Sequence, residues 1–97
     1  MIELTGKQKR GLRSKANRLE SKFQIGKEGV GETFLAMLDK ALEANELLKI
    51  SILKNCDLER DEAALAICKA LDAAYVQGIG RTIVIYRPSK KNPRIEI

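Results

Sequence analysis

The 97-residue sequence contains no histidine and no tryptophan, and its only aromatic residues are two phenylalanines and two tyrosines. Without histidine the chain lacks the commonest general base, and Ser-His and Cys-His nucleophile pairs cannot form. The usual mixed metal sites also need histidine. The acidic residues Glu59, Asp61 and Glu62 cluster at an expected helix start, where the helix dipole explains them. We therefore expect no enzyme activity, no cofactor and no metal site.

Cysteine is also scarce. Cys56 and Cys68 are too few for a structural zinc site and do not resemble a secreted disulfide framework. Cys68 lies in an alanine-rich segment and is interpreted as a small buried apolar residue. Cys56 precedes an expected helix start, which can lower the pKa of a thiol, so it is the one candidate reactive cysteine. Because no histidine or second cysteine is nearby in the sequence, a structural role is favoured for Cys56 as well.

Long apolar runs are missing. No stretch approaches the roughly 18 apolar residues of a membrane span. The N-terminal sequence is basic where a signal peptide would be apolar. We expect a cytoplasmic protein without a membrane partner.

Positive charge is abundant and unevenly distributed. Lysine and arginine outnumber aspartate and glutamate by 18 to 13, giving a net charge of +5. Residues 1–22 carry seven bases and two acids, and residues 78–97 carry five bases and one acid, whereas residues 28–72 hold ten acids and five bases. This asymmetry predicts a surface built from both ends of the chain that faces a polyanion, although a charge run is more often only a solvated face.

The segment after Thr5 predicts an amphipathic helix, since Thr5 and Gln8 form a capping-box pattern. Apolar residues recur at helical spacing in Leu12, Ala16, Leu19 and Phe23. Basic residues cluster on nearly the opposite side: Lys7, Lys15, Arg18 and Lys22, extended by Arg10 and Arg13. The helix is expected to present a basic outer face.

The remaining chain alternates strand and helix patterns. A short strand is expected at 23–25, and a second helix from near Gly31 with one apolar face, formed by Phe34, Met37, Leu38, Ala41 and Leu42. Alternation over 48–52 predicts a strand with one buried face. Asp57 is the expected N-cap of a third helix, whose apolar stripe is Ala64, Cys68, Leu71 and Tyr75. Segments 75–77 and 82–86 flank the glycine-rich turn 78–81 of a hairpin.

The order αβαβαββ predicts one α+β domain over residues 1–97. Strands joined through helices favour a mixed four-stranded sheet with helices packed on it and one antiparallel hairpin. Pro88 and Pro93 place the tail 88–97 outside the main sheet or at its edge, either flexible or packed.

The stretch Gly26-Lys27-Glu28-Gly29 lies between an expected strand and an expected helix. Two glycines would let a nucleic-acid backbone approach closely, and the following helix start offers free N–H groups to a phosphate. The KH module clamps nucleotides with such a GXXG loop. A tight turn that needs glycine for positive φ explains the same residues and is favoured on backbone grounds. Glu28 also offsets the charge of Lys27.

Four blocks of the sequence together resemble the CRM domain, and more specifically its stand-alone bacterial form, the YhbY family. They run in order along the chain: LTGKQKRGLR at 4–13, QIGKEG at 24–29, LKNC at 53–56 and QGIGRTIVIYRP at 77–88. At Gly78 the sequence departs from the family pattern, because many members carry an apolar strand residue there.

The resemblance implies an RNA-binding fold similar to the C-terminal domain of translation initiation factor three, with the topology αβαβαββ. It also implies association with precursors of the large ribosomal subunit, as for the bacterial members; plant organellar relatives act in group II intron splicing and ribosome maturation. The GXXG loop of the family falls on Gly26, Lys27, Glu28 and Gly29. Its basic first helix falls on Lys7, Lys9, Arg10 and Arg13.

We therefore predict a non-catalytic, monomeric RNA-binding protein that assists ribosome assembly, with structured ribosomal RNA as its partner and no small-molecule substrate. The expected RNA-binding residues are Lys7, Lys9, Arg10, Arg13, Arg18, Gly26, Lys27, Glu28, Gly29, Arg81 and Arg87. The first helix, Arg81 and Arg87 would contact phosphates. A base-stacking platform is disfavoured by the few aromatics, with Tyr86 the one tyrosine retained as an exception. The alternative is a basic module that docks an acidic protein, with RNA binding incidental.

Overall fold

The computed structural model describes residues 3–95 and confirms the predicted order αβαβαββ. The seven elements are α1 (Gly6–Ala16), β1 (Phe23–Ile25), α2 (Glu32–Asn45), β2 (Leu47–Ile52), α3 (Arg60–Leu71), β3 (Ala74–Ile79) and β4 (Thr82–Tyr86). Among these residues, no helix is long and apolar enough to cross a membrane.

The four strands form one mixed sheet, as predicted, and their order in it is β1-β2-β4-β3. β1 pairs in parallel with β2, while β2 and β3 both run antiparallel to β4. The β3–β4 turn is Gly80-Arg81, with Gly80 at φ +57°. Glycine at the first central position is typical of a tight two-residue hairpin.

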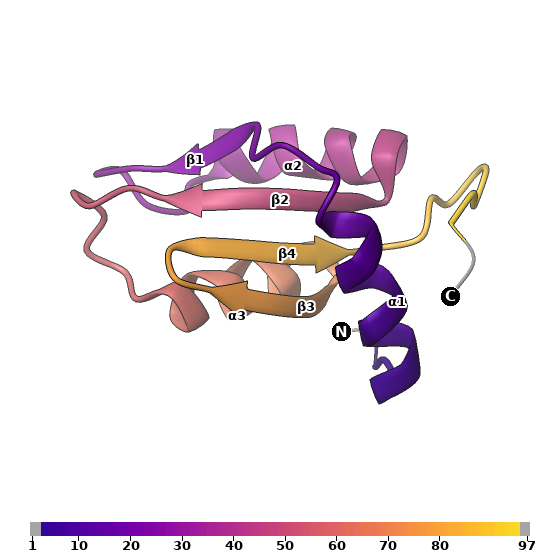
Figure 1. Ribbon diagram of the computed structural model, residues 1–97. Coiled ribbons are helices and arrows are strands. Elements are labelled where there is room, and N and C mark those ends of the chain that lie inside the picture. The colour runs from indigo at the N-terminus through magenta and orange to yellow at the C-terminus, as the bar shows by residue number, and fades with distance from the viewer. Residues whose placement is uncertain (1–2, 96–97) are drawn as a thin grey trace.

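Helices cover both faces of the sheet (Figure 1). On one face, α2 and α3 pack on the alternating residues Leu48, Ile50 and Ile52, which confirms the predicted buried face of β2. On the other face α1 packs Leu12 and Ala16 onto a second cluster, formed by Leu47, Val76, Val84 and Tyr86. The basic helix α1 therefore lies on the opposite side of the sheet from α2 and α3.

The first helix is shorter than its apolar spacing predicts. Its capping box is present, with Thr5 and Gln8 exchanging backbone-to-side-chain hydrogen bonds of 2.9 and 3.1 Å. The helix ends at Ala16, where Leu19 N–H donates to the Ala16 carbonyl in a tighter three-residue turn. Leu19 still packs against the second cluster, but Phe23 belongs to β1. Arg18 and Lys22 consequently lie on the α1–β1 connection and not on the helix.

The other two helices also differ from expectation in detail. On α2, Leu38 and Leu42 are buried as predicted, but Met37 is 48% exposed. The N-cap of α3 is Glu59 and not Asp57. The predicted stripe of α3 stops at Leu71, because Asp72 adopts left-handed backbone at φ +55° and ends the helix. Tyr75 consequently lies in β3.

The tail packs against the C-terminal end of α2 and joins no strand. Buried Glu46 accepts backbone hydrogen bonds from Ser89, Arg94 and Ile95 at 2.8, 2.7 and 2.9 Å. Glu43 accepts one from Lys90 N–H at 2.9 Å. The described part of the predicted tail, residues 88–95, is therefore tied to α2 through two carboxylates, and residues 96–97 lie outside the described part of the chain.

Candidate nucleic-acid interface

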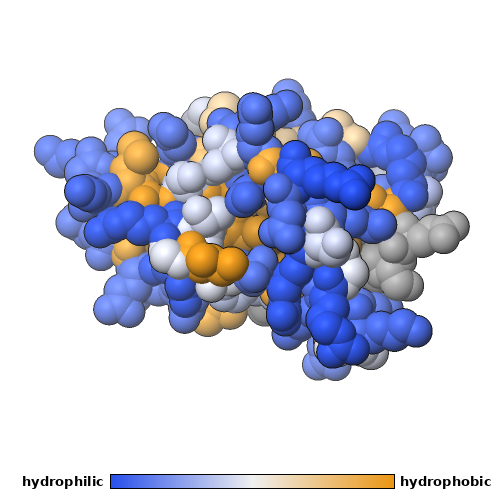
Figure 2. Space-filling view, viewed as in Figure 1, coloured by the Kyte–Doolittle hydropathy of each residue, from blue (hydrophilic) through white to orange (hydrophobic). Residues whose placement is uncertain are grey.

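The cations of α1 differ in exposure along the helix. Lys7 and Arg10 are exposed, and Lys9 and Arg13 are half-buried along the helix. We call these four residues the helix cluster. Between residues 3 and 95 the ion pairs are Arg60–Asp61, Arg87–Asp39 and Arg94–Glu46, so none of them neutralises α1. Figure 2 shows hydrophilic side chains gathered over α1 on this face. The helix cluster is available to phosphates.

The glycine loop turns the chain from β1 into α2. Gly29 N–H donates to the Gly26 carbonyl at 3.0 Å, and Gly29 has φ +69°, a conformation that other residues rarely adopt. The tight turn therefore needs glycine at position 29 for its positive φ, as one of the two explanations of the loop expects. Lys27 and Glu28 are exposed at the tip of the loop.

Beyond the loop, α2 begins without a side-chain cap. Its N-cap residue is Gly31, which offers no side-chain oxygen, so the first-turn N–H groups have no such partner. A helix N-terminus of this kind favours a bound anion. The loop and the helix start are compatible with the backbone approach that the sequence predicts for a GXXG loop.

Arg81 lies at the same end of the sheet as the glycine loop. The Arg81 carbonyl accepts a hydrogen bond of 2.7 Å from Ile52 N–H, and Ile52 pairs with Ile25, the residue before Gly26. Sequence reasoning missed Lys54 and Arg60, which line a hollow of about 500 Å³ with Arg81. Asp57 and Glu59 line the same hollow. Positive charge is therefore largely balanced at this end.

The helix cluster and the glycine loop lie at opposite ends of the sheet (Figure 1). α1 packs on Leu47, where β2 begins, and on Tyr86, where β4 ends. The glycine loop follows the other end of β2. Between these two ends β2 runs for six residues, which span about 20 Å at about 3.3 Å per residue. α1 therefore does not lie beside the glycine loop, because strand register and not chain order decides which ends meet.

The sequence predicts Arg87 as a phosphate contact, but in the structure its side chain does not face solvent. Its side chain is only 7% exposed and pairs with Asp39 at 2.7 Å. The same guanidinium donates to the backbone carbonyls of Leu71 and Asp39, both at 3.1 Å. The structure thus corrects the assignment of Arg87 as a phosphate contact, since its charge joins the start of the tail to α2 and α3.

Tyr86 is 2% exposed, and burial raises the pKa of its hydroxyl. It lies under α1 in the second cluster and presents no face on which a base could stack. The expectation that Tyr86 could stack on a base is therefore wrong.

The two cysteines are free thiols in different surroundings. Cys68 is fully buried, and burial raises its pKa to about 11. Cys56 is half-buried and packs against the larger core cluster. Within residues 3–95, no three histidine, cysteine, aspartate or glutamate side chains are grouped to hold a metal ion.

Arg18 borders a groove that the sequence did not reveal. The groove has a volume of about 490 Å³ and lies between the α1–β1 connection, the start of β2, the end of α2 and Ile95. Three further cations line it: Lys15, Lys22 and Lys49. The run of bases after residue 13 was the one sign of this groove in the sequence. Where those bases lie in the structure depends on the path of residues 17–22 between α1 and β1.

Comparisons with known proteins agree with this architecture. The family model described as the CRS1/YhbY (CRM) domain matches residues 4–87. The Bacillus subtilis protein named "Probable RNA-binding protein YqeI" is 49% identical over 94 residues, covering 97% of this chain and 98% of that protein. A Haemophilus influenzae protein named "RNA-binding protein" is 36% identical over 92 residues, covering 94% and 92% of the two chains.

A solved structure shows the same fold. The solution structure of the hypothetical protein SAV1595 from Staphylococcus aureus matches with a TM-score of 0.81 and 45% identity, covering 98% of this chain and 99% of that one. Gly78 is also explained: the Tyr75 hydroxyl and the Arg60 guanidinium occupy the space that a larger residue would take. Four ordered sequence blocks, the matching topology and nearly full-length relatives lead to one conclusion: the chain belongs to the CRS1/YhbY (CRM) domain family.

Proposed function

We propose that the protein binds RNA without catalysing a reaction, and that it assists ribosome assembly by binding ribosomal RNA in precursors of the large subunit. The observation that carries this proposal is the helix cluster, in which four cations along α1, two of them exposed, have no acidic partner among residues 3–95. Relatives named as RNA-binding proteins support the same partner.

The mechanism is phosphate neutralisation at the α1 end and backbone approach at the glycine-loop end. Each phosphate contact releases counterions, so binding should weaken steeply with salt. The α1 end dominates because acids offset the cations near Arg81. The protein acts as a monomer in the cytoplasm, and it reads RNA mainly by shape, since Tyr86 is buried.

The test is a titration with structured fragments of large-subunit ribosomal RNA at several salt concentrations. Lys7→Ala/Arg10→Ala should lower affinity and flatten the log-log salt slope by about 1.4 to 1.8, at about 0.7 to 0.9 per contact. Lys40→Ala/Lys69→Ala removes the same charge from exposed positions on α2 and α3 and is the matched control. Lys27→Ala/Arg81→Ala should give a smaller loss than the α1 pair.

Equal affinity of the α1 pair and the control pair would overturn the assignment of α1 as the RNA-binding face. The assembly role is tested separately by sedimenting cell extract on a gradient, where we expect the protein among large-subunit precursors. Its absence from every ribosomal fraction would overturn that role. Retention of an acidic protein, but no RNA, after nuclease treatment would favour the protein-docking alternative.

A further inference from the structure

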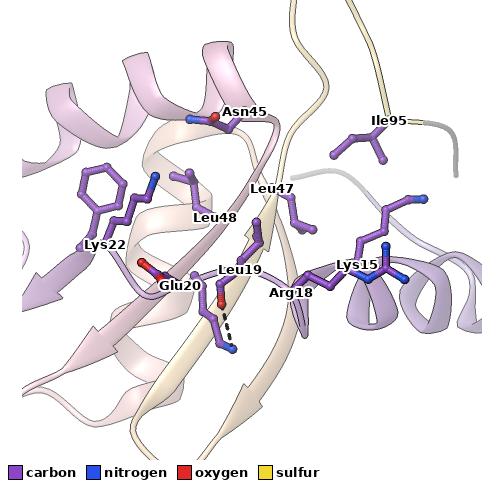
Figure 3. Close-up of a pocket in the computed structure, with 11 residues that line it drawn as sticks. Lys15, Arg18, Leu19, Glu20, Lys22, Asn45, Leu47, Leu48 and Ile95 are labelled. Atoms are coloured by element: carbon purple, nitrogen blue, oxygen red, sulfur yellow. Dashed lines mark hydrogen bonds between the residues drawn. The ribbon is translucent and has the colours of Figure 1, made fainter.

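The groove beside Arg18 combines an apolar floor with a cationic rim (Figure 3). Leu47 and Leu48 are 4% and 5% exposed, and half-buried Leu19 and Ile95 border them. In Figure 3, Lys15 and Arg18 lie at one end of the groove, Lys22 lies at the other end, and Asn45 lies above the leucines. The helix cluster and the glycine loop do not account for this combination.

Charge in the groove favours an anion. Four cations line it, Lys15, Arg18, Lys22 and Lys49, against one acid, Glu20. None of the four belongs to the ion pairs found within residues 3–95. Lys49 donates only a long hydrogen bond of 3.5 Å, to the Leu19 carbonyl. An ammonium has three donors, so Lys49 can also bind a ligand from the floor of the groove.

The apolar lining of the groove favours a ligand that has an apolar part in addition to a phosphate. An inorganic anion gains nothing from the half-buried side chains of Leu19 and Ile95, whereas a nucleobase would bury its apolar face on them. Asn45 donates to the Ala41 carbonyl at 3.1 Å, and its side-chain oxygen has no hydrogen-bond partner in the described part of the chain. That oxygen can accept from the amino group of a base. A volume of about 490 Å³ suits one small ligand and excludes a duplex.

We propose that this groove receives one unpaired nucleotide of the bound RNA, with its base on half-buried Leu19 and Ile95 and its phosphates on the surrounding cations. The inference rests on the proposed RNA binding and deepens it. The preferred RNA would be structured but would carry a bulged or looped-out nucleotide next to the stem that α1 contacts. The tail contributes Ile95 to the wall, positioned by the hydrogen bond from its backbone to Glu46.

The experiment compares two RNA hairpins that differ by a single bulged nucleotide. Wild-type protein should bind the bulged hairpin about fivefold to tenfold more tightly, equivalent to about 1 to 1.4 kcal/mol. Asn45→Ala and Lys22→Ala should each reduce this preference. The matched controls, Asn92→Ala and Lys40→Ala, change exposed side chains outside the groove and should keep it.

Equal affinity of wild-type protein for the two hairpins would overturn the nucleotide assignment while leaving RNA binding in place. Failure to bind either hairpin would overturn both proposals. Adenosine 5′-monophosphate should also shift the NMR amide signals of Leu19 and Leu47, and it should do so at lower concentration than inorganic phosphate, which can contact only the cations. Shifts produced by an acidic leucine-containing peptide, without a preference for the bulge, would instead assign the groove to a protein partner and overturn the proposal.

Discussion

The guanidinium of Arg87 donates a hydrogen bond of 2.7 Å to the carboxylate of Asp39, which lies 48 residues earlier in the chain. Arg87→Ala would leave the backbone carbonyls of Leu71 and Asp39 without this donor, and it would remove a side chain that is only 7% exposed. We expect a loss of about 2 to 3 kcal/mol in the free energy of unfolding, measured by urea denaturation.

Arg81→Ala is the matched control for Arg87→Ala, because Arg81 is exposed and its substitution should change stability by no more than about 0.5 kcal/mol. An Arg87→Ala protein with wild-type stability but weakened RNA binding would contradict the structural role of Arg87.

Acid should detach the tail from α2. Hydrogen bonds from Lys90 N–H and the Ser89 hydroxyl lower the pKa of Glu43 from 4.5 to about 2. For a carboxyl whose pKa is lowered on folding, stabilisation is complete above the unfolded value and disappears as pH falls through the folded value. The Lys90 amide signal in NMR spectra should therefore move between about pH 4.5 and pH 2.

Glu43→Gln should make the Lys90 amide signal much less sensitive to acid. The remaining change would come from Glu46, whose pKa is also lowered: burial opposes its ionisation, but the N–H donors of Ser89, Arg94 and Ile95 outweigh that cost. A wild-type Lys90 signal that stays constant down to pH 2 would refute carboxylate anchoring of the tail.

Gly78 leaves space for the hydroxyl of a nearby tyrosine. A side chain at position 78 would overlap the Tyr75 hydroxyl and place its Cβ 2.6 Å from Arg60 Nε. Burial and a hydrogen bond to Asp61 raise the pKa of Tyr75 to about 12. Gly78→Val should displace the hydroxyl from Asp61 and lower this pKa towards 10, with little loss of stability because the displaced groups are the ends of long side chains.

Ultraviolet absorption during an alkaline titration measures this shift, and Tyr75→Phe identifies which transition belongs to Tyr75. If the Tyr75 transition is unchanged in Gly78→Val, the pKa of the Tyr75 hydroxyl does not depend on the absence of a side chain at position 78.

Gly11 is the weak point of α1. It lies in the helix, is exposed, and a Cβ there would meet nothing within 4 Å. Gly11→Ala should raise the free energy of unfolding by about 0.5 to 1 kcal/mol. Thermal unfolding followed by circular dichroism measures this change. A decrease in stability would indicate that residue 11 has an unrecognised close neighbour.

Local patterns predicted most of the fold. The capping box at Thr5 and the alternation of Leu48, Ile50 and Ile52 depend on neighbours within a few residues, and both are present. The end of α1 was missed because Leu19 continues the helical spacing after the chain has already turned. Features that depend on neighbouring residues were predicted correctly, whereas the end of the helix depends on contacts with residues far away in the chain.

The site was less predictable for the same reason. Arg87 looks like another basic residue until a carboxylate from α2 meets it, and no local pattern contains that contact. The groove likewise needs residues from 15 to 95 brought together. Basic character could be inferred from composition, but its division between two ends of the sheet could not.

The length of β2, about 20 Å between the end on which α1 packs and the end that bears the glycine loop, has a consequence for RNA length. If one RNA engages both ends, the second contact forms at a high effective concentration once the first is made. A fragment too short to span β2 would lose that gain in full, however well it fitted either end. The paired strands fix the interval, so the protein would select its RNA by the distance between phosphates rather than by base sequence.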